Sequence, residues 1–591
     1  MSAQTRNQGL LRPRTGLHWA LLGAASGFGY ALLGLLASEP LAWWPLAPLS
    51  LLPLFAAAMV GSRAPRRSTW RLAAGVWVGS LPLWVVTHSW MFFVSPVGFV
   101  PGMLLQGAWA GLFVLLAAIA LRQRLAPIGI ALALALTWSF VEVFRGSVLF
   151  GGYAWLLVGH PMIDAPWIGR SGAVVGAYGV GFLLALSMAA LVSLGGTSRR
   201  RLSTVGLAFV PFLLLGAMAA IAPRIDESSG ARVAVIQTNV PQDNRLAWTI
   251  EDQLASFAQF MEMTAQARGR ADLVVWPETM LPGPPISPQA LGEMQRFGLV
   301  YATDIPGLER VPAWSFAEQT MALQAELGVP MIVGATGVDG LTLSAAPDGS
   351  VVQQDDGFFN SAHLFLDGNL TEPRYDKLRL TIFGEVLPLV SRWDWLEEKL
   401  LLIGAGGMRF DLDAGRNPVW FNLPAGEAAT LRVATPICFE VAYAGVCRRL
   451  ASGGDQRVDA LVNLTNDGWF GSSDAGRAMH LKLARWRALE NGVPIVRAAN
   501  TGISTIVDAR GGMAPTSVEH PDGPGQHGVS TAGQTFATRT SAIVLGDVPG
   551  RTVSATPYAR FGFLTPWFLG IGGVGLLIRS MVRSSRPASS A

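Results

Sequence analysis

The first 222 residues consist largely of apolar segments about 20 residues long, and one more lies near the end of the chain. A helix needs about 20 apolar residues to cross the roughly 30 Å hydrocarbon core of a bilayer. Because backbone polar groups find no partner in lipid, each crossing segment is predicted to be helical. We therefore predict a bundle of about eight transmembrane helices, over residues 17–37, 41–60, 72–94, 97–121, 126–145, 172–194, 203–222 and 561–578.

The composition excludes several classes of protein. Of the 591 residues, 51% are hydrophobic and only 14% are charged, whereas soluble domains carry about 25% charged residues. Two cysteines cannot build a disulfide scaffold or a four-thiolate zinc site, and the seven histidines include no pair at metal-ligand spacing. A net charge of +4 is small for this length and does not indicate nucleic-acid binding. We expect a membrane protein with no metal, no other cofactor and no nucleic-acid partner.

Arginines cluster at alternate ends of the predicted spans. They precede the first span and follow the second, fourth, sixth and eighth, at Arg6, Arg12, Arg14, Arg63, Arg66, Arg67, Arg71, Arg122, Arg124, Arg199, Arg200, Arg201, Arg579, Arg583 and Arg586. Since cytoplasmic loops carry the excess of Lys and Arg, both termini are predicted to be cytoplasmic. The first span could instead be a cleaved signal, which would leave the orientation unchanged. Residues 147–170 are apolar but interrupted by Gly and Pro, which indicates an interfacial or re-entrant loop.

The chain is predicted to divide into three parts. Residues 1–225 form a bundle of about seven spans, residues 226–555 form a globular domain outside the cytoplasm, and residues 556–591 form a last span with a basic cytoplasmic tail. In the middle part, short β-rich runs such as "RVAVIQTNV", "ADLVVWPE" and "DALVNLTND" alternate with helical runs such as "SSDAGRAMHLKLARWRALENG". This alternation predicts a layered α/β domain.

Polar side chains follow several of the predicted strands, and one of them is a cysteine. Glu278 follows "ADLVVWP", Cys438 and Glu440 end "LRVATPICFE", and Asn466 and Asp467 end "DALVNLTND". In layered α/β folds, ligands collect where strand ends open into loops. These positions are therefore the first candidates for a site.

A cysteine nucleophile needs a base or a cation, because its thiol has a pKa of about 8.5. A desolvated Glu278 could take the proton, and Lys377 in "EPRYDKLRLTIFGEVLPL" could hold an oxyanion. Each residue also has an ordinary interpretation: Cys438 as a buried hydrophobe, Glu278 as a helix cap, and Lys377 as a solvated lysine. Cys438 could also pair with Cys447 in an oxidising compartment, although "AYAGVCRRLASGG" is predicted to be a helix that leads away from the strand end.

The order of the motifs narrows these alternatives. "WPE", "YDK", "FGE" and "ICFE" follow one another as the Glu–Lys–Cys motifs of the nitrilase superfamily do, and "FFNSAHLF", "NLTNDGWFG" and "HLKLARWRALENGVPIVRAANTGIS" extend the match. A nitrilase-like domain after seven spans and before an eighth resembles the bacterial apolipoprotein N-acyltransferase family, the membrane-embedded branch of that superfamily. The resemblance covers essentially the whole chain.

The resemblance implies a fold, a set of residue roles and a reaction. It implies an αββα sandwich in which Glu278 is the general base, Lys377 the oxyanion stabiliser and Cys438 the nucleophile. Glu385 would orient Lys377, and Glu440 would be a supporting acid near the cysteine. The implied reaction moves an acyl chain from a phospholipid, most simply phosphatidylethanolamine, through a Cys thioester to a diacylated apolipoprotein. A monomer in the bacterial inner membrane, without a cofactor, would suffice.

Apolar groups around the site would disfavour hydrolysis of a thioester. Trp248, Trp469, Phe470 and Trp155 are candidates for such a wall, although tryptophans are also common interfacial anchors. Arg145, with Glu142, could contact a phosphate head group, or the two could be a snorkelling pair.

The sequence departs from the family pattern at four places, which include Phe439 and residues 296–314 as well as Ala154 and the run "KLRLTIFGE". Phe439 stands where relatives commonly have tyrosine, and residues 296–314 are predicted to form an enlarged loop. These departures concern donor and acceptor preference rather than the catalytic residues.

Two other functions use the same observations. A membrane-tethered amidase or nitrilase would share Glu278, Lys377 and Cys438 but resolve the thioester with water. A non-enzymatic membrane scaffold would not require the complete set of catalytic positions. A transporter would be expected to place ionisable groups in mid-span, and here they lie at span ends.

Overall fold

The computed structural model describes residues 16–123, 125–193, 198–226, 230–241, 248–381, 385, 412–425, 429–520, 527–531 and 534–585. The chain divides into two compact units, which we describe separately. One is helical and contains the residues up to Phe92, Gly98–Ile221 and the residues from Phe561. The other contains Phe93–Val97 and Ala222–Arg560.

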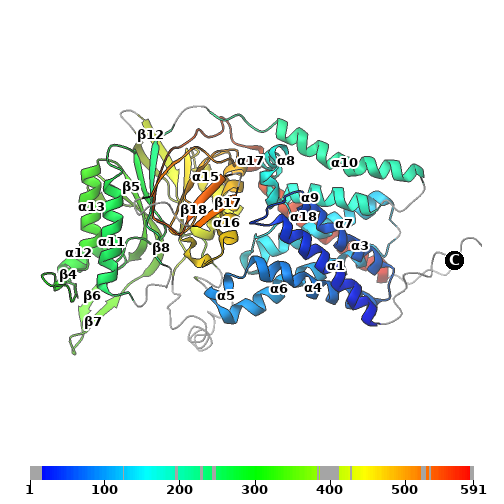
Figure 1. The fold of residues 1–591 in the computed structure, drawn as a ribbon, viewed down its shortest axis with the longest axis horizontal. Coiled ribbons are helices and arrows are strands. Elements are labelled where there is room, and N and C mark those ends of the chain that lie inside the picture. Colours follow the sequence, from blue (N-terminus) through cyan, green and yellow to red (C-terminus); the bar gives the residue numbers. More distant parts are fainter. Residues whose placement is uncertain are drawn as a thin grey trace, which may run out of the picture. The chain divides into compact units, whose positions relative to one another are not determined.

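The helical unit contains a helix at each of the eight predicted spans (Figure 1). Among the described residues, five helices are long and apolar enough to cross a membrane, so a count of about eight spans stays a prediction. α4 falls outside these five, and its first turn carries arginines. The helices are α1 (Gly16–Ala37), α2 (Leu46–Leu49), α3 (Leu51–Ser62), α4 (Arg66–Thr87), α5 (Met91–Val94), α6 (Pro96–Ala120), α7 (Pro127–Val143), α9 (Gly172–Val192), α10 (Ser198–Ala220) and α18 (Thr565–Ser585).

Glycines allow α1 and α4 to approach each other closely. A Cβ on Gly23 would lie 2.1 Å from the carbonyl oxygen of Leu72, and one on Gly79 would lie 2.2 Å from that of Ala24. Gly27 and Gly75 are in the same situation, so both helices carry glycines four residues apart at the contact. Small residues at this spacing bring helix backbones together in lipid, where no hydrophobic effect drives helices to associate.

Residues 147–170 form no long helix of their own, as predicted. After α7 the chain forms a π-helical turn η1 (Phe144–Val148) and 3-10 turns η2 (Leu149–Gly151) and η3 (His160–Asp164). The short helix α8 (Pro166–Arg170) then precedes α9. Whether this segment lies at a membrane interface stays a prediction.

The second unit contains two sheets that lie between helices (Figure 1). The first sheet has the order β10-β8-β5-β2-β1-β19-β16, with β9 beside β8, and the second has the order β11-β12-β13-β14-β15. Helices α11 (Ile250–Ala265) and α13 (Ser315–Leu327) lie outside the first sheet, and α15 (Ala444–Ser452) and α16 (Asp474–Asn491) lie outside the second. This is the predicted αββα sandwich.

Parallel strands at the centre of each sheet place several chain turns at one edge. In the first sheet, β1 (Arg232–Gln237), β2 (Leu273–Trp276) and β5 (Met331–Asp339) run parallel. In the second sheet, β12 (Ala429–Ala434), β13 (Ala460–Thr465) and β14 (Ile495–Ala499) run parallel. These central strands are almost entirely buried, as is typical of parallel sheets covered on both faces.

The remaining strands complete the two sheets and add three small hairpins. They are β3 (Val300–Ala302), β4 (Arg310–Pro312), β6 (Thr342–Ala345), β7 (Val351–Gln354), β8 (Gly357–Leu366), β9 (Asn369–Leu370), β10 (Tyr375–Asp376), β11 (Phe421–Ala425), β15 (Thr505–Val507), β16 (Ser517–Glu519), β17 (His527–Thr531), β18 (Gln534–Thr538) and β19 (Ala542–Asp547). The predicted enlarged loop at 296–314 is wrong in part, because β3 and β4 pair there as an antiparallel hairpin after α12 (Pro288–Phe297).

Candidate active site

Cys438 does not lie in a strand, as the apolar run suggested, but in a tight turn after one. β12 ends at Ala434, and Cys438 begins the 3-10 turn η5 (Cys438–Ala442). Its φ of 52° is in the left-handed region, which residues other than glycine seldom adopt. Backbone strain of this kind concentrates at functional sites. The side chain of Cys438 is partly exposed, whereas its neighbours in the turn are buried.

The buried carboxylate of Glu440 accepts hydrogen bonds at the base of this turn. Its Oε2 accepts hydrogen bonds from the Ile437 backbone N–H at 2.7 Å and from the Tyr375 hydroxyl at 2.8 Å. Its Oε1 accepts one from the Arg379 backbone N–H at 3.0 Å. Burial raises the pKa of Glu440 to about 7, although these hydrogen bonds oppose the shift. Glu440 therefore bonds to the start of the turn, to the Tyr375 hydroxyl and to the segment that carries Lys377, and its supporting role stays a prediction.

Glu278 occupies the turn that follows β2 in the first sheet. Its Oε1 accepts a hydrogen bond from Asn360 Nδ2 at 2.8 Å, and its Oε2 accepts one from the Asn466 backbone N–H at 2.8 Å. Glu278 lies close enough to Cys438 for its charge to raise the pKa of the thiol. Burial raises the pKa of Glu278 above its ordinary value, with only partial opposition from the charge of Lys377. A carboxylate in this situation is a suitable proton acceptor for a thiol.

Lys377 is buried, with 1% of its surface exposed, between two carboxylates. Its Nζ lies 2.7 Å from Glu385 Oε2 and 3.6 Å from Glu278 Oε1. Burial alone would lower the pKa of Lys377, but the charge of Glu385 and the other acidic groups reverses the shift and raises it. The pKa of Glu385 is lowered despite burial, because Lys377 lies beside it. The pair therefore stays ionised, and the role of Glu385 in orienting Lys377 stays a prediction.

The electrostatics of the three residues define their resting protonation states. Burial raises the pKa of the Cys438 thiol, and the negative charge of Glu278 raises it further. The Cys438 thiol is therefore protonated at neutral pH, and the Lys377 ammonium lies 3.6 Å from Glu278 Oε1. A developing thiolate or oxyanion would be stabilised by Lys377 only after Glu278 has taken the proton.

Asn360 is a residue that the sequence interpretation missed. Its Nδ2 donates to Glu278 Oε1 at 2.8 Å and to Glu385 Oε1 at 2.9 Å, so one amide group bridges both carboxylates. It lies on β8, in the motif "FFNSAHLF" that precedes the lysine. The motif could have marked Asn360 as a candidate site residue. Only the tertiary structure, however, indicates that this asparagine faces the site.

The aromatic candidates lie at different places. Trp248 packs, half-buried, against the hydrophobic core that contains Phe257 and Phe316. Trp469 and Phe470 belong to the turn η6 (Asp467–Phe470), and the Phe470 ring lies 5.6 Å from the ring of His480. A role of these three residues in shielding the thioester stays a prediction.

Trp155 and Arg145 belong to the helical unit. Trp155 is 1% exposed and stacks on Tyr153 with ring centroids 6.2 Å apart. Arg145 Nη1 donates to the carbonyl oxygens of Tyr153 at 3.1 Å and Trp155 at 2.7 Å, and Glu142 Oε1 accepts from the Val158 backbone N–H at 2.8 Å. The snorkelling interpretation is wrong, because both charged side chains are buried and hold residues 153–158. A phosphate contact for Arg145 stays a prediction.

The two cysteines are not paired. Both Cys438 and Cys447 are free, and Cys447 lies buried on α15 with its Sγ donating to the Glu440 carbonyl oxygen at 3.5 Å. The disulfide alternative is therefore wrong, and the predicted helix around Cys447 is confirmed.

Apolar helices joined to an αββα domain that gathers Glu278, Lys377 and Cys438 define a membrane-bound enzyme of the carbon–nitrogen hydrolase class. The comparisons with known proteins agree. Residues 232–549 match the model "Carbon-nitrogen hydrolase", and residues 30–190 match "Apolipoprotein N-acyltransferase N-terminal domain". The chain belongs to the apolipoprotein N-acyltransferase family.

Curated relatives support this assignment along most of the chain. An apolipoprotein N-acyltransferase of Azotobacter vinelandii is 31% identical over 517 residues, covering 84% of this chain and 86% of that protein. Another from Pseudomonas putida is 31% identical over 505 residues, covering 81% and 85%. Among solved structures, an amidase from Nesterenkonia sp. AN1 has a TM-score of 0.33 and 15% identity, covering 57% of this chain and 95% of that one.

Proposed function

We propose that this protein transfers an acyl chain from a phospholipid, through a thioester on Cys438, to the N-terminal amine of an S-diacylglyceryl-cysteine lipoprotein. The observation that carries the proposal is the buried cluster in which a raised-pKa carboxylate, Glu278, and an ammonium group, Lys377, meet a cysteine held in a left-handed turn. Because the chain belongs to an acyltransferase family, we assign this cluster to the N-acylation of lipoproteins.

In the first half-reaction, Glu278 takes the proton from the Cys438 thiol as Sγ attacks the ester carbonyl carbon of the phospholipid. The ammonium group of Lys377 stabilises the oxyanion of the tetrahedral intermediate. When the intermediate collapses, the bond to the glycerol oxygen breaks, and Glu278 returns its proton to that oxygen. The products are a thioester on Cys438 and a lysophospholipid.

In the second half-reaction, the free α-amine of the acceptor cysteine attacks the thioester carbonyl carbon. Glu278 takes a proton from the attacking nitrogen, and Lys377 again faces the oxyanion. Collapse forms the amide bond, breaks the carbon–sulfur bond and leaves Cys438 to regain its proton from Glu278. Acceptance of water instead of the amine would make the same residues a hydrolase, which is the alternative function.

The apolar helices explain why this reaction would take place at a membrane. Both substrates carry acyl chains, and leaving them in water is unfavourable by about 0.8 kcal/mol per CH₂ group. We infer that the spans keep the tails in the bilayer while the head groups reach the domain of residues 226–555. The arginine pattern supports cytoplasmic termini, with the catalytic domain on the other side of the inner membrane.

Arg379 is the cation that we assign to the phosphate of the donor. Its guanidinium lies 4.5 Å from the ring centroid of Tyr443, which immediately follows the turn that carries Cys438. The backbone N–H of Arg379 donates to Glu440 Oε1. This bond holds the backbone of Arg379 close to the turn that carries Cys438. Guanidinium groups recognise phosphate oxygens with two parallel hydrogen bonds.

The decisive experiment is intact-mass spectrometry of the full-length protein with phosphatidylethanolamine, then with a diacylglyceryl-cysteine peptide. We expect an adduct of one acyl chain, absent from Cys438→Ala and discharged by the peptide. Cys447→Ala is the matched control and should acylate normally, since the Cys447 thiol is buried on α15 and bonds to the Glu440 carbonyl oxygen rather than to a reacting group. Discharge by water but not by the peptide would establish the hydrolase. Failure of Cys438 to acylate with any phospholipid would refute the proposal.

A further inference from the structure

Hydrogen bonds join the two sheets of the catalytic domain beside the candidate base. In the first sheet β1 pairs with β2, and in the second sheet β13 pairs with β14. The residues that meet between the sheets are Val240 after β1, Glu278 after β2, Asn466 after β13 and Asn500 after β14. None of these four residues is more than 7% exposed. The proposed mechanism uses only Glu278, so the other three need an explanation.

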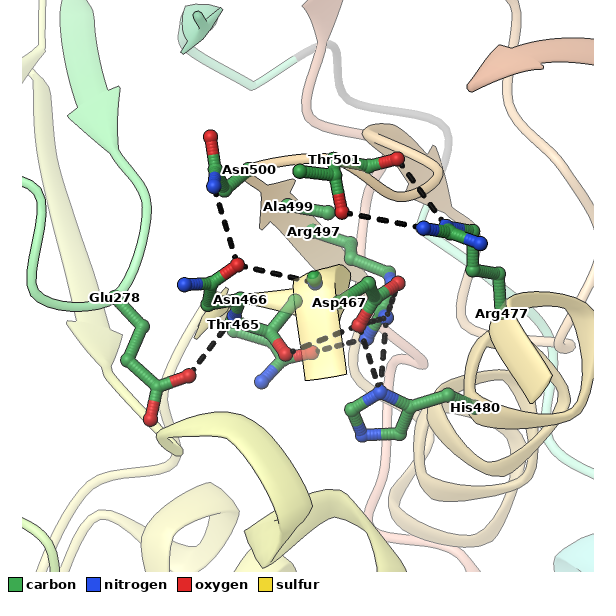
Figure 2. Close-up of polar contacts among 12 residues, drawn as sticks. Glu278, Thr465, Asn466, Asp467, Arg477, His480, Arg497, Ala499, Asn500 and Thr501 are labelled. Carbon is green, nitrogen blue, oxygen red and sulfur yellow. Dashed lines mark hydrogen bonds and ion pairs between the residues drawn. The ribbon is translucent and has the colours of Figure 1, made fainter. Parts of the chain in front are cut away.

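The first bond between the sheets holds the base. The Asn466 backbone N–H donates to Glu278 Oε2 at 2.8 Å (Figure 2). The other oxygen, Oε1, accepts from Asn360 Nδ2, so each oxygen of the carboxylate has a donor. A hydrogen bond to a carboxylate favours the ionised form and lowers its pKa. The position of the Asn466 N–H therefore affects where Glu278 lies and how readily it takes a proton.

Asn500 makes the second connection between the sheets. Its Nδ2 donates to the Val240 carbonyl oxygen at 2.7 Å, and its Oδ1 accepts from the Val240 backbone N–H at 2.8 Å. The same Nδ2 donates to Asn466 Oδ1 at 3.1 Å (Figure 2). One amide can make all three bonds, because it carries two N–H donors and an acceptor oxygen. Asn500 thus connects the end of β1 with the turn that holds Glu278.

The backbone is strained at both points where the second sheet holds the first. Thr279, immediately after Glu278, has a φ of 53°, and a β-branched residue in this left-handed region is an outlier. Asn239, immediately before Val240, has a φ of 61°. Strained conformations persist only where the surrounding structure over-determines them. The bonds from Asn466 and Asn500 are therefore placed where the chain most needs to be held.

The turn that carries Asn466 is fixed by its next residue as well. Arg497 Nη2 donates to Asp467 Oδ1 at 2.9 Å and to Oδ2 at 2.8 Å, and His480 Nδ1 lies 2.9 Å from Asp467 Oδ1 (Figure 2). Asp467 and Arg497 have no exposed surface. Breaking a buried ion pair leaves an uncompensated charge, so this pair holds the turn in one conformation. Asn500 then ties that turn to β1.

We propose that Asn500 is a positioning residue, which acts through Asn466 to hold a backbone N–H against Glu278 Oε2 and so keeps the carboxylate aligned for proton transfer. The inference deepens the proposed function, and it rests on the step in which Glu278 takes the proton of the thiol. Asn500 acts on Glu278 only through Asn466. Its loss should therefore change the titration of the base and leave the binding of lipid as it is.

The ionisable groups around Glu278 decide how the test is designed. Burial raises the pKa of Glu278, the charge of Lys377 at 3.6 Å lowers it, and the charge of Glu385 raises it. Cys438 is a third titratable neighbour, on which the charge of Glu278 acts. Replacing an asparagine by alanine leaves all these charges in place. A change in the titration of Glu278 then reports the loss of a hydrogen bond and not an added charge.

The test measures single-turnover acylation by phosphatidylethanolamine as a function of pH in Asn500→Ala and Asn466→Ala. Asn500→Ala removes all three bonds, whereas Asn466→Ala leaves the two bonds between Asn500 and Val240 intact. In both variants the fall in rate at low pH should begin about 1–2 pH units higher, the shift expected when a carboxylate loses a charged hydrogen bond. The half-saturating lipid concentration should not change. The double variant should show no further shift, because both substitutions break the same connection.

Ser504→Ala is the matched control, because it removes another buried bond between the two sheets. Ser504 Oγ donates to Gln237 Oε1 at 2.6 Å, and Gln237 is the last residue of β1. This substitution should lower the melting temperature, as Asn500→Ala should, because each leaves a buried polar group without its partner. It should not move the pH at which acylation begins to fall.

Alkylation of Cys438 by iodoacetamide, in a Cys447→Ala background, is a second readout that needs no lipid. Its fall at low pH should move upward in Asn500→Ala and Asn466→Ala as well, because the thiol must again give its proton to Glu278. If the wild type never acylates with phospholipid but this shift appears, the proposed function fails and the inference about Asn500 stands.

Three outcomes would overturn the inference. The first is an unchanged pH profile in a folded Asn500→Ala or Asn466→Ala variant. The second is an equal shift in Ser504→Ala, or a double variant whose shift is the sum of the two single shifts. The third is failure of both asparagine variants to fold, which would make these bonds a folding element and not a positioning device. Acylation of the wild type on Cys438 would leave the proposed function intact in each case.

Discussion

Glu278→Gln tests the base assignment most directly. Asn360 and Asn466 donate to different oxygens of Glu278, and a glutamine offers only one oxygen, so one donor loses its acceptor. A buried donor without a partner lowers the free energy of unfolding by about 1–3 kcal/mol. This loss is small enough that the variant should remain folded, so its activity can be measured.

The effect on acylation should be larger. Because burial and the charge of Glu278 raise the pKa of the Cys438 thiol, very little of it ionises spontaneously at neutral pH. Loss of a general base slows a reaction about 10²–10⁴-fold, which corresponds to about 3–5 kcal/mol of activation free energy. We expect single-turnover acylation by phosphatidylethanolamine, followed by intact mass, to slow by this factor.

The pH dependence gives an independent signature. Wild-type acylation requires ionised Glu278, whose pKa is raised, so its rate should fall with decreasing pH already above the ordinary glutamate pKa of about 4.3. In Glu278→Gln only spontaneously formed thiolate reacts, so the rate should rise about tenfold per pH unit. Glu293→Gln is the control, since Glu293 is 9% exposed on α12 and accepts from the Leu343 backbone. A flat profile and a rate within about tenfold of wild type would refute the assignment.

The remaining predictions concern four residues around the thiol. Lys377→Met should slow acylation about 10²–10³-fold, because it removes the group that faces the oxyanion; an unchanged mass-spectrometric rate would exclude the role. Arg379→Gln should raise the half-saturating donor concentration about 10–100-fold with an unchanged maximal rate, since a charged hydrogen bond contributes about 1.5–3 kcal/mol. Kinetics in mixed micelles measure both quantities. A loss confined to the maximal rate would argue against phosphate binding. Glu440→Gln should lower the melting temperature and slow alkylation of Cys438, because its carboxylate accepts from Ile437 at the start of the turn and from Arg379 in the segment that carries Lys377. Unchanged values for both would contradict its supporting role. Cys447→Ala should retain full activity with or without reductant, because both cysteines are free; sensitivity to reductant would contradict this.

Features that depend on local physics could be predicted from the sequence. Apolar segments about 20 residues long predicted helices at all eight positions, because the bilayer fixes the length of a crossing. Alternation of β-rich and helical runs predicted the layered domain, and polar residues at strand ends predicted where the site would lie. The order of the motifs identified Glu278, Lys377 and Cys438, which the structure brings together.

Features that depend on which strands become neighbours could not be predicted. Glu278 is 188 residues from Asn466 and 82 from Asn360, and only the order of strands in the two sheets makes them partners. The same holds for Arg145, whose burial against residues 153–155 contradicts the snorkelling interpretation. Charge and spacing in a sequence do not specify which carbonyl oxygens will surround a guanidinium.

The sequence by itself therefore determined the parts of this protein: the apolar helices, the αββα domain and the motifs that carry Glu278, Lys377 and Cys438. The tertiary structure alone decided how those parts become reactive. The left-handed φ of Cys438, the amide of Asn360 between two carboxylates, and the buried pairing of Asp467 with His480 all arise from packing. The physical reason is that pKa values and backbone strain depend on burial and on neighbours distant in sequence, and a linear pattern contains neither.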